Sequence, residues 1–211
     1  MSLSSQKAIA EKLLQAEAVK LNAENPFTWA SGWKSPIYCD NRKLLSYPYL
    51  RDFVKSELCN VIFEKYSDAE AIAGVATAGI PWGAMVADQL KLPFVYVRSK
   101  PKDHGMGNQI EGVVKPGQKI VMVEDLISTG ISSLQAANSL LIENVEVISI
   151  VSIFNYGFEK AVSAFENSNI PFFSLTNYNA LIELAVEKNI IKKVDRDVLL
   201  QWRENPAEWG K

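Results

Sequence analysis

Apolar residues recur along this chain with two periods, one typical of helices and one typical of buried strands. Near the N-terminus, Ile9, Leu13 and Leu21 share a stripe at helical spacing, which predicts a helix over residues 5–21. A second stripe predicts a helix over residues 47–65. Beyond these, short apolar runs alternate with helical patterns. The expected strands are 71–75, 94–97, 119–123, 146–154 and 172–174, and the expected helices are 80–90, 131–143, 158–168, 179–188 and 195–202.

This alternation predicts the α/β fold class, with a mostly parallel sheet flanked by helices. Continuous apolar strands are buried on both faces, which requires helices on either side of the sheet. In such sheets ligands bind outside the carboxyl ends of the strands, so the segments that follow strands are the places to look for chemistry.

Composition and charge narrow the class of protein. The 211 residues are 48% hydrophobic with a net charge of −2, which suits one globular domain and gives no basic field for nucleic acid. Two cysteines make no disulfide framework, and one histidine, His104, would have to carry any histidine chemistry alone. No apolar run approaches the ~20 residues of a membrane span. We therefore expect a cytoplasmic protein that binds neither nucleic acid nor membrane.

The most informative segment joins an apolar strand to a helix through two acids. Glu124 and Asp125 follow Ile120–Val123 at once, and the turn Ser128-Thr129-Gly130-Ile131-Ser132 leads into the helix. Backbone N–H groups and the helix dipole at such a turn favour a phosphate. The acids suit the diol of a ribose, a metal, or both. The ordinary alternative is that Ser or Thr merely caps the helix.

Two further segments have the composition of anion-binding loops. Residues 74–81, Gly-Val-Ala-Thr-Ala-Gly-Ile-Pro, join a strand to a helix with small residues that let backbone amides approach a ligand. Residues 98–111 carry Arg98, Lys100, Lys102 and His104 and almost nothing apolar, which favours a mobile cationic lid. The alternatives are a tight turn and a solvated basic loop.

Aromatic residues gather in a fourth segment, residues 27–40. Interleaved with turn residues, they could form a flat slot for a planar ring, with Lys34 offering a cation. The alternative is a buried aromatic hairpin. Trp202 and Trp209, near the other end of the chain, are expected to pack rather than to bind a ligand.

Residues 121–132 resemble the 5-phosphoribosyl-1-diphosphate (PRPP) signature of type I phosphoribosyltransferases. Together the four segments resemble the orotate phosphoribosyltransferase family over nearly the whole chain. Phe27-Thr28, Ser31-Gly32 and Lys34-Ser35-Pro36 are similar to that family's base-binding segment, and Lys102-Asp103-His104-Gly105 to its catalytic loop. The catalytic loop separates this family from purine-type relatives, whereas the acidic signature is specific only to the wider superfamily.

The resemblance implies a single phosphoribosyltransferase domain over residues 1–211, with residues 1–45 forming a small N-terminal hood that contributes the base-binding segment. It implies a glycosyltransferase (pentosyltransferase) that moves the 5-phosphoribosyl group from PRPP to orotate, giving orotidine 5′-monophosphate and diphosphate in de novo pyrimidine (UMP) biosynthesis. The implied cofactor is Mg²⁺, bound mainly through PRPP without a metal site of protein ligands. The implied assembly is a homodimer whose lid loop reaches the neighbouring site.

The resemblance also assigns residues to roles. The catalytic group comprises Arg98, Lys102, His104 and Asp125. PRPP binding falls on Arg98, Lys102, His104, Thr77, Ala78, Glu124, Asp125, Leu126, Ile127, Ser128, Thr129, Gly130, Ile131 and Ser132. Orotate binding falls on Ser128, Lys34, Tyr38 and Cys39.

Several positions depart from the better-known pattern of the family. Ala30 stands where a lysine is expected, Thr77-Ala78 replaces a Tyr-Lys pair, and Ser99 replaces a basic residue with Lys100 one position on. Asn155-Tyr156-Gly157 stands where an arginine would hold the orotate carboxylate. Lys34 is a candidate replacement for a lost cation, and the carboxylate contact stays unassigned.

Three other functions compete with this one. A phosphoribosyltransferase for adenine or hypoxanthine is disfavoured by the Lys-Asp-His-Gly loop and the aromatic segment. A PRPP-sensing regulator would need a basic face or an added DNA-binding domain, for which the chain offers no spare length. A Rossmann-like binding module would open a helix with G-x-G-x-x-G, which the sequence lacks.

Overall fold

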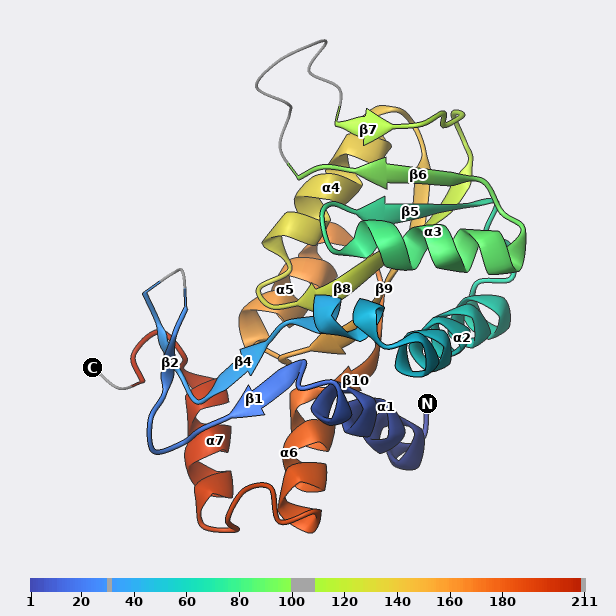
Figure 1. Cartoon of the computed structure of the whole chain (residues 1–211). Coiled ribbons are helices and arrows are strands. Elements are labelled where there is room, and N and C mark those ends of the chain that lie inside the picture. Colours follow the sequence, from blue (N-terminus) through green and yellow to red (C-terminus); the bar gives the residue numbers. More distant parts are fainter. Residues whose placement is uncertain (30–31, 100–108, 210–211) are drawn as a thin grey trace.

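A six-stranded sheet forms the centre of the protein (Figure 1). The computed structural model describes residues 1–29, 32–99 and 109–209. The strand order is β10-β9-β8-β5-β6-β7, and every pair is parallel except β6 with β7. The strands are β5 (Ala71–Val75), β6 (Phe94–Val97), β7 (Ile110–Glu111), β8 (Lys119–Ile127), β9 (Glu146–Asn155) and β10 (Phe172–Asn177). The predicted mostly parallel α/β fold is confirmed.

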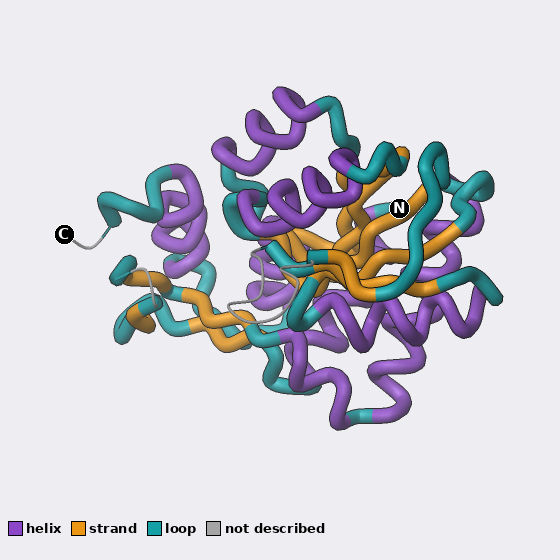
Figure 2. Tube along the Cα trace, turned by 90° about the horizontal axis from the view of Figure 1, so that it is seen from above, coloured by secondary structure: helices purple, strands orange, loops and turns teal. Residues whose placement is uncertain are grey.

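Helices cover both faces of this sheet (Figure 2). They are α1 (Leu3–Gln15), α2 (Pro48–Lys65), α3 (Gly79–Leu90), α4 (Ile131–Ile142), α5 (Glu159–Ser168), α6 (Tyr178–Glu187) and α7 (Asp195–Glu204). One core, with Leu58 and Trp82, lies beneath α1, α2, α3 and α6. The other core, with Leu140 and Phe165, lies beneath α4 and α5. Burial on both faces explains why the strands read as continuous apolar runs.

The first helix is shorter than the hydrophobic pattern predicts. It ends at Gln15, and Glu17 adopts a positive φ of 49° that turns the chain. Residues Val19–Leu21 then form strand β1, antiparallel to β4 (Ile37–Cys39). The predicted helical span up to residue 21 was therefore wrong. Leu21 continues the helical stripe in sequence, but pairing with a strand that comes 16 or more residues later decides its conformation.

Four short strands and one short helix build the region between α1 and α2. Besides β1 and β4, strands β2 (Phe27–Thr28) and β3 (Lys34–Ser35) form an antiparallel pair, and the 3-10 helix η1 (Asn41–Ser46) follows β4. These strands lie beside α7 (Figure 1). The indole N–H of Trp202 on α7 donates to the Lys34 carbonyl at 3.0 Å. The C-terminal helix therefore supports a segment near the other end of the sequence.

Aromatic rings fill the junction between this region and the sheet. Trp202 is fully buried, and its ring lies 5.5 Å from Trp29 and 5.8 Å from Tyr156. Trp209 packs against the same core. The expectation that these two C-terminal tryptophans pack is confirmed.

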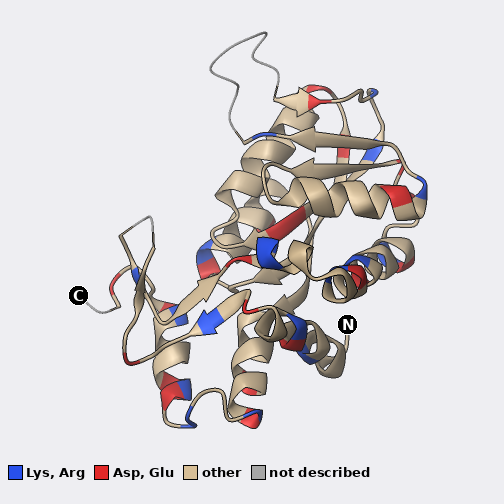
Figure 3. Cartoon of the chain, in the orientation of Figure 1, with Lys and Arg blue, Asp and Glu red and all other residues tan. Residues whose placement is uncertain are grey.

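The helices and loops carry charges of both signs (Figure 3). Most of the ion pairs in the described ranges lie at the surface, such as Lys192 with Glu24. Within the part of the chain that the structure describes, no helix is long and apolar enough to cross a membrane.

Candidate active site

The two acids lie inside strand β8 rather than after it. β8 continues to Ile127, four residues beyond the predicted end. Glu124 pairs with Ser152 of β9 and Ile127 with Asn155, whereas the pairing with β5 stops at Val123. The predicted strand end was wrong because carboxylates are rare in buried strands. At the position of the acids, β8 pairs with β9 but no longer with β5. The side of β8 that faces β5 is therefore open to a ligand there.

Glu124 is held by hydrogen bonds on both carboxylate oxygens. Ser133 Oγ donates to Oε2 at 3.1 Å, and the Asp125 N–H donates to Oε1 at 3.0 Å. Only 7% of Glu124 is exposed, and this burial, followed by the adjacent Asp125 charge, raises its pKa well above the ordinary value. Burial raises the pKa of Asp125 as well. Two adjacent, desolvated carboxyls repel each other when both are ionised, which adds to the free-energy cost of ionising the pair.

The turn after β8 presents free backbone donors. Gly130 is the N-cap of α4 with a positive φ of 76°, and no side chain caps the helix. Ile131 and Ser132, which begin α4, are exposed. The alternative that Ser128 or Thr129 serves as an ordinary N-cap was therefore wrong. Uncapped N–H groups at the positive end of a 12-residue helix favour an anion.

A second loop, between β5 and α3, lies against β8 just before the acids. A Cβ added to Gly79 would lie 2.4 Å from the Val123 carbonyl oxygen, so only glycine allows α3 to begin this close to β8. The predicted residues Thr77 and Ala78 immediately precede Gly79, and the Ala76–Thr77 peptide bond is cis. The two phosphate-type loops predicted from the sequence therefore meet at one edge of the sheet.

Arg98 stands directly after β6. Its backbone N–H donates to the Gln109 carbonyl at 2.8 Å, and the Gln109 side-chain amide donates to the Arg98 carbonyl at 3.1 Å. Its guanidinium lies 5.7 Å from the centre of the Tyr96 ring and 3.9 Å from the Glu111 carboxylate. Ile110–Glu111 form strand β7. The predicted loop over residues 98–111 was thus wrong at its C-terminal end, because an edge strand begins there.

Two of the predicted catalytic residues, Lys102 and His104, lie outside the described residues, as does Lys100. Their roles stay predictions.

The predicted base-binding residues lie on two antiparallel strand pairs, β1 with β4 and β2 with β3, and in the turn after β8, where Ser128 stands. Tyr38 and Cys39 belong to β4, where Tyr38 is exposed and its ring lies 5.9 Å from Phe27. Burial of the Cys39 thiol, with the nearby Asp125 and Asp40 charges, raises its pKa well above the ordinary value. Lys34 belongs to β3, and its ammonium group donates to Thr28 Oγ1 at 2.9 Å within the same hairpin. The described contacts bring β4, but not the Lys34 ammonium group, to the acids.

Three residues that sequence reasoning missed complete this arrangement. The Asn41 side-chain amide donates to the Asp125 carbonyl oxygen at 2.7 Å, which fastens the start of η1 to the acids. Arg42 pairs with Asp40 at 2.6 Å, and its charge acts to lower the pKa of Asp125 against the effect of burial. Ser133 donates to Glu124. No local pattern marks Asn41, because its partner is 84 positions away.

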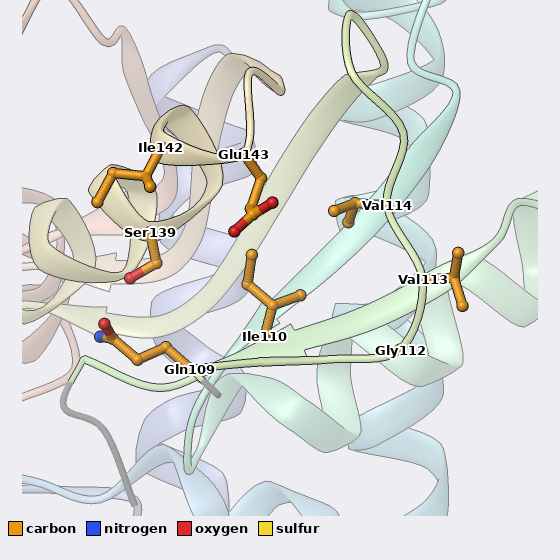
Figure 4. A pocket seen from close by; sticks show the side chains of 8 residues that line it. All are labelled: Gln109, Ile110, Gly112, Val113, Val114, Ser139, Ile142 and Glu143. Carbon is orange, nitrogen blue, oxygen red and sulfur yellow. The ribbon is translucent and has the colours of Figure 1, made fainter. Parts of the chain in front are cut away.

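A cavity of about 470 Å³ lies elsewhere, between the segment after β6 and the C-terminal half of α4 (Figure 4). Gln109, Ile110, Ser139 and Glu143 are among its lining residues. Glu143 lies about 18 Å along α4 from the turn, at 1.5 Å per residue. This cavity is therefore separate from the acids.

Comparison with known proteins identifies the family to which this chain belongs. Residues 56–188 match the model of the phosphoribosyl transferase domain family. The chain is 55% identical to the orotate phosphoribosyltransferase of Bacteroides thetaiotaomicron, over 97% of this chain and 96% of that protein. The chain belongs to the orotate phosphoribosyltransferase family. It is accordingly a phosphoribosyltransferase, an enzyme of the glycosyltransferase type.

Solved structures agree with this family assignment. Orotate phosphoribosyltransferase from Aeropyrum pernix superimposes with a TM-score of 0.72 at 27% identity, over 87% of this chain and 99% of that one. UMP synthase from Leishmania donovani gives a TM-score of 0.77 at 28% identity, over 95% of this chain and 43% of that one. The type I phosphoribosyltransferase fold is thus confirmed.

Proposed function

We propose that this protein catalyses the Mg²⁺-dependent transfer of the 5-phosphoribosyl group from PRPP to orotate. The products are orotidine 5′-monophosphate and diphosphate, and the reaction belongs to de novo pyrimidine biosynthesis. The observation that carries the proposal is the hydrogen bond from Asn41 to Asp125. It joins the aromatic base-binding segment to the acids between the two phosphate-type loops.

In this proposal PRPP binds across the carboxyl ends of β8 and β5. The 5′-phosphate accepts hydrogen bonds from the backbone N–H groups of residues 128–132, at the start of α4. Glu124 and Asp125 bind the ribose hydroxyls. Both Glu124 oxygens also accept hydrogen bonds, from Ser133 and from the Asp125 N–H, which fix the orientation of this carboxyl group.

The diphosphate extends toward Thr77, Ala78 and Arg98. Breaking the bond between C1 and the diphosphate oxygen builds positive charge on the ribose and negative charge on the leaving group. Arg98 stabilises the leaving group electrostatically, and Lys102 and His104 are predicted to do the same. Arg98 already faces Glu111 at 3.9 Å. Binding of a diphosphate would give its guanidinium a second, stronger anionic partner.

The protein side of the site fits a metal held mainly by substrate oxygens. Among the described residues, no three or more His, Cys, Asp or Glu side chains gather as a metal site, and the acids supply two carboxylates. Mg²⁺ keeps several waters and uses few protein ligands. When bound, it would neutralise part of the diphosphate charge.

Orotate is proposed to lie beside Ser128, with Tyr38 and Cys39 lining its ring. Its N1 attacks C1 of the ribose as diphosphate leaves, and the N1 proton passes to solvent or to the leaving diphosphate. No covalent enzyme intermediate is needed. Exclusion of water from the closed site protects PRPP from hydrolysis. Sharing of the site within a homodimer, with residues 98–111 reaching the neighbouring subunit, stays a prediction, as does the cytoplasmic location.

Absorbance of orotate tests the proposal. Mixing the protein with orotate, PRPP and Mg²⁺ should lower the orotate absorbance and yield orotidine 5′-monophosphate. Omitting PRPP, or adding a chelator, should abolish the change. Orotate loss without PRPP would contradict the proposed reaction, and full activity in excess chelator would contradict the metal requirement.

A further inference from the structure

A cavity of about 220 Å³ lies at the carboxyl ends of β9 and β10. It is lined by Asn155, Tyr156, Gly157, Asn177, Tyr178, Asn179 and Arg203. Asn155 pairs with Ile127, and the Tyr156 N–H donates to the Ile127 carbonyl at 3.1 Å. Ser128, the predicted orotate contact, follows Ile127. Since neighbouring strands lie about 4.8 Å apart, this cavity adjoins the proposed ring site on the side away from β5.

Arg203 reaches this cavity from α7. Its Nη1 atom would lie 3.5 Å from a Cβ added to Gly157, and Asn155 Oδ1 would lie 3.7 Å from the same point. The guanidinium therefore lies over the Asn155-Tyr156-Gly157 segment, where the sequence lacks the arginine expected for the orotate carboxylate. An arginine from the C-terminal helix thus lies beside the segment that follows β9.

The position of Arg203 is fixed by its neighbours. The preceding residue, Trp202, is fully buried and bonded to the Lys34 carbonyl. Tyr178 Oη donates to the Leu199 carbonyl at 2.9 Å, one turn earlier on α7. Arg203 itself is half-buried, and no carboxylate of the described ranges forms an ion pair with it. A positioned and unpaired guanidinium favours an anionic ligand.

The surrounding groups define the class of that ligand. A guanidinium binds a carboxylate through two parallel hydrogen bonds, and the side-chain amide of Asn155 can donate to or accept from a polar ring edge. Tyr156 and Tyr178, both almost fully buried, are among the residues that line the cavity. A planar heterocycle with one carboxylate matches these features.

We propose that Arg203 binds the carboxylate of the pyrimidine substrate and so sets the preference for orotate over uracil, the same ring without a carboxylate. This inference rests on the proposed function, which it deepens by naming the residue that reads the substrate's charged group.

Steady-state kinetics of Arg203→Gln and Arg203→Lys test the proposal. Loss of a charged hydrogen-bond partner should raise the KM for orotate by about ten- to a hundredfold in Arg203→Gln. The KM of Arg203→Lys for orotate should lie between those of this variant and the wild type. Lysine keeps the positive charge but cannot form the two parallel hydrogen bonds of a guanidinium. The KM for PRPP and any slow turnover of uracil should change by less than about twofold. Arg196→Gln, two helical turns earlier on α7, is the matched control and should behave as the wild type.

Each result decides the matter. An unchanged KM for orotate in a folded Arg203→Gln protein would overturn the role of Arg203 and leave the proposed function standing. If the wild-type protein does not turn over orotate at all, the proposed function fails, and orotate binding followed by tryptophan fluorescence still tests Arg203. If both variants unfold, wild-type binding of orotate is compared with binding of its methyl ester, and equal affinities would overturn the proposal.

Discussion

The side-chain amide of Asn41 donates a hydrogen bond to the backbone carbonyl oxygen of Asp125 at 2.7 Å. Asn41 is fully buried at the start of η1, and its Oδ1 accepts from the Cys39 thiol at 3.2 Å. One side chain thus joins the strand predicted to line the base to the acid predicted to bind the ribose. The two substrates would meet where these segments are fastened together.

Asn41→Ala should weaken both stability and catalysis. Removing the amide leaves the Asp125 carbonyl without this partner, at a cost of about 1–3 kcal/mol in the free energy of unfolding. The KM values for orotate and PRPP should rise together, because the two binding segments lose their link. Urea unfolding and steady-state kinetics measure both effects. Asn60→Ala, at an exposed position of α2 where the side-chain amide donates to Glu57, is the control and should be near neutral. An Asn41→Ala protein as stable as this control would refute the link.

Gly130→Ala should cost more than Gly117→Ala, although both glycines have nearly the same positive φ, 76° and 77°. A Cβ at Gly130 would lie 2.7 Å from Phe165 Cε2, whereas nothing lies within 4 Å of one at Gly117. Backbone strain of about 1–2 kcal/mol is common to both variants. Gly130→Ala should lose additional stability because its Cβ displaces the turn. For the same reason, only this variant should lose PRPP affinity. Thermal unfolding and PRPP titration compare the two, and equal losses would show that the turn tolerates the contact.

Glu124→Gln should stabilise the protein at neutral and alkaline pH. The pKa of Glu124 is raised in the folded state from the ordinary 4.5, chiefly by burial. Its protonated form therefore favours folding, and this advantage is lost as pH rises from about the unfolded pKa through the raised native pKa. A permanently neutral glutamine avoids that loss. The melting temperature should exceed that of the wild type at pH 8, by about 2–4 °C for each kcal/mol, and match it near pH 4.

Glu143→Gln, the same exchange at an exposed position directly after α4, is the control for that measurement. If the melting temperature of the wild type rises with pH relative to that of Glu124→Gln, the pKa of Glu124 is not raised in the folded protein, and the prediction fails.

Lys102→Ala should lower kcat by about 10²-fold or more, judging from the usual cost of losing one donor to developing negative charge. Mixing this variant with Asp125→Asn should restore part of the activity if each site combines residues from two subunits. Heterodimer formation is checked with differently tagged chains. Exchange without recovery would argue against shared sites, and near-normal turnover of Lys102→Ala alone would remove Lys102 from the catalytic group.

Local sequence patterns predicted the scaffold well because its elements are set by local apolar periodicity. Strands β5 and β6 have the expected bounds, and α3 begins one residue early, at Gly79. The acids at the end of β8 and the small residues of the turn after it were also identifiable, since they lie in one short stretch, residues 124–132. The N-terminal helix was overextended at Leu21, where pairing with β4 outweighs helical periodicity.

Contacts between distant segments were not predictable in the same way. Nothing near Asn41 indicates that it will meet Asp125, and nothing near Arg203 indicates that it will lie over Gly157. Both contacts depend on where η1 and α7 pack after the sheet has formed. The sequence did identify the gap that Arg203 would fill, because the expected arginine is missing from residues 155–157.

Substrate identity is tested most directly in parallel reactions in which the protein is mixed with PRPP, Mg²⁺ and one base: orotate, adenine or hypoxanthine. The nucleotide formed in each reaction is then identified. We predict that orotidine 5′-monophosphate alone accumulates, and that Asp125→Asn forms little of it. Turnover of a purine with none of orotate would contradict the proposed substrate while leaving the fold intact. No turnover of any base, together with tight PRPP binding, would contradict catalysis itself and favour a regulatory protein.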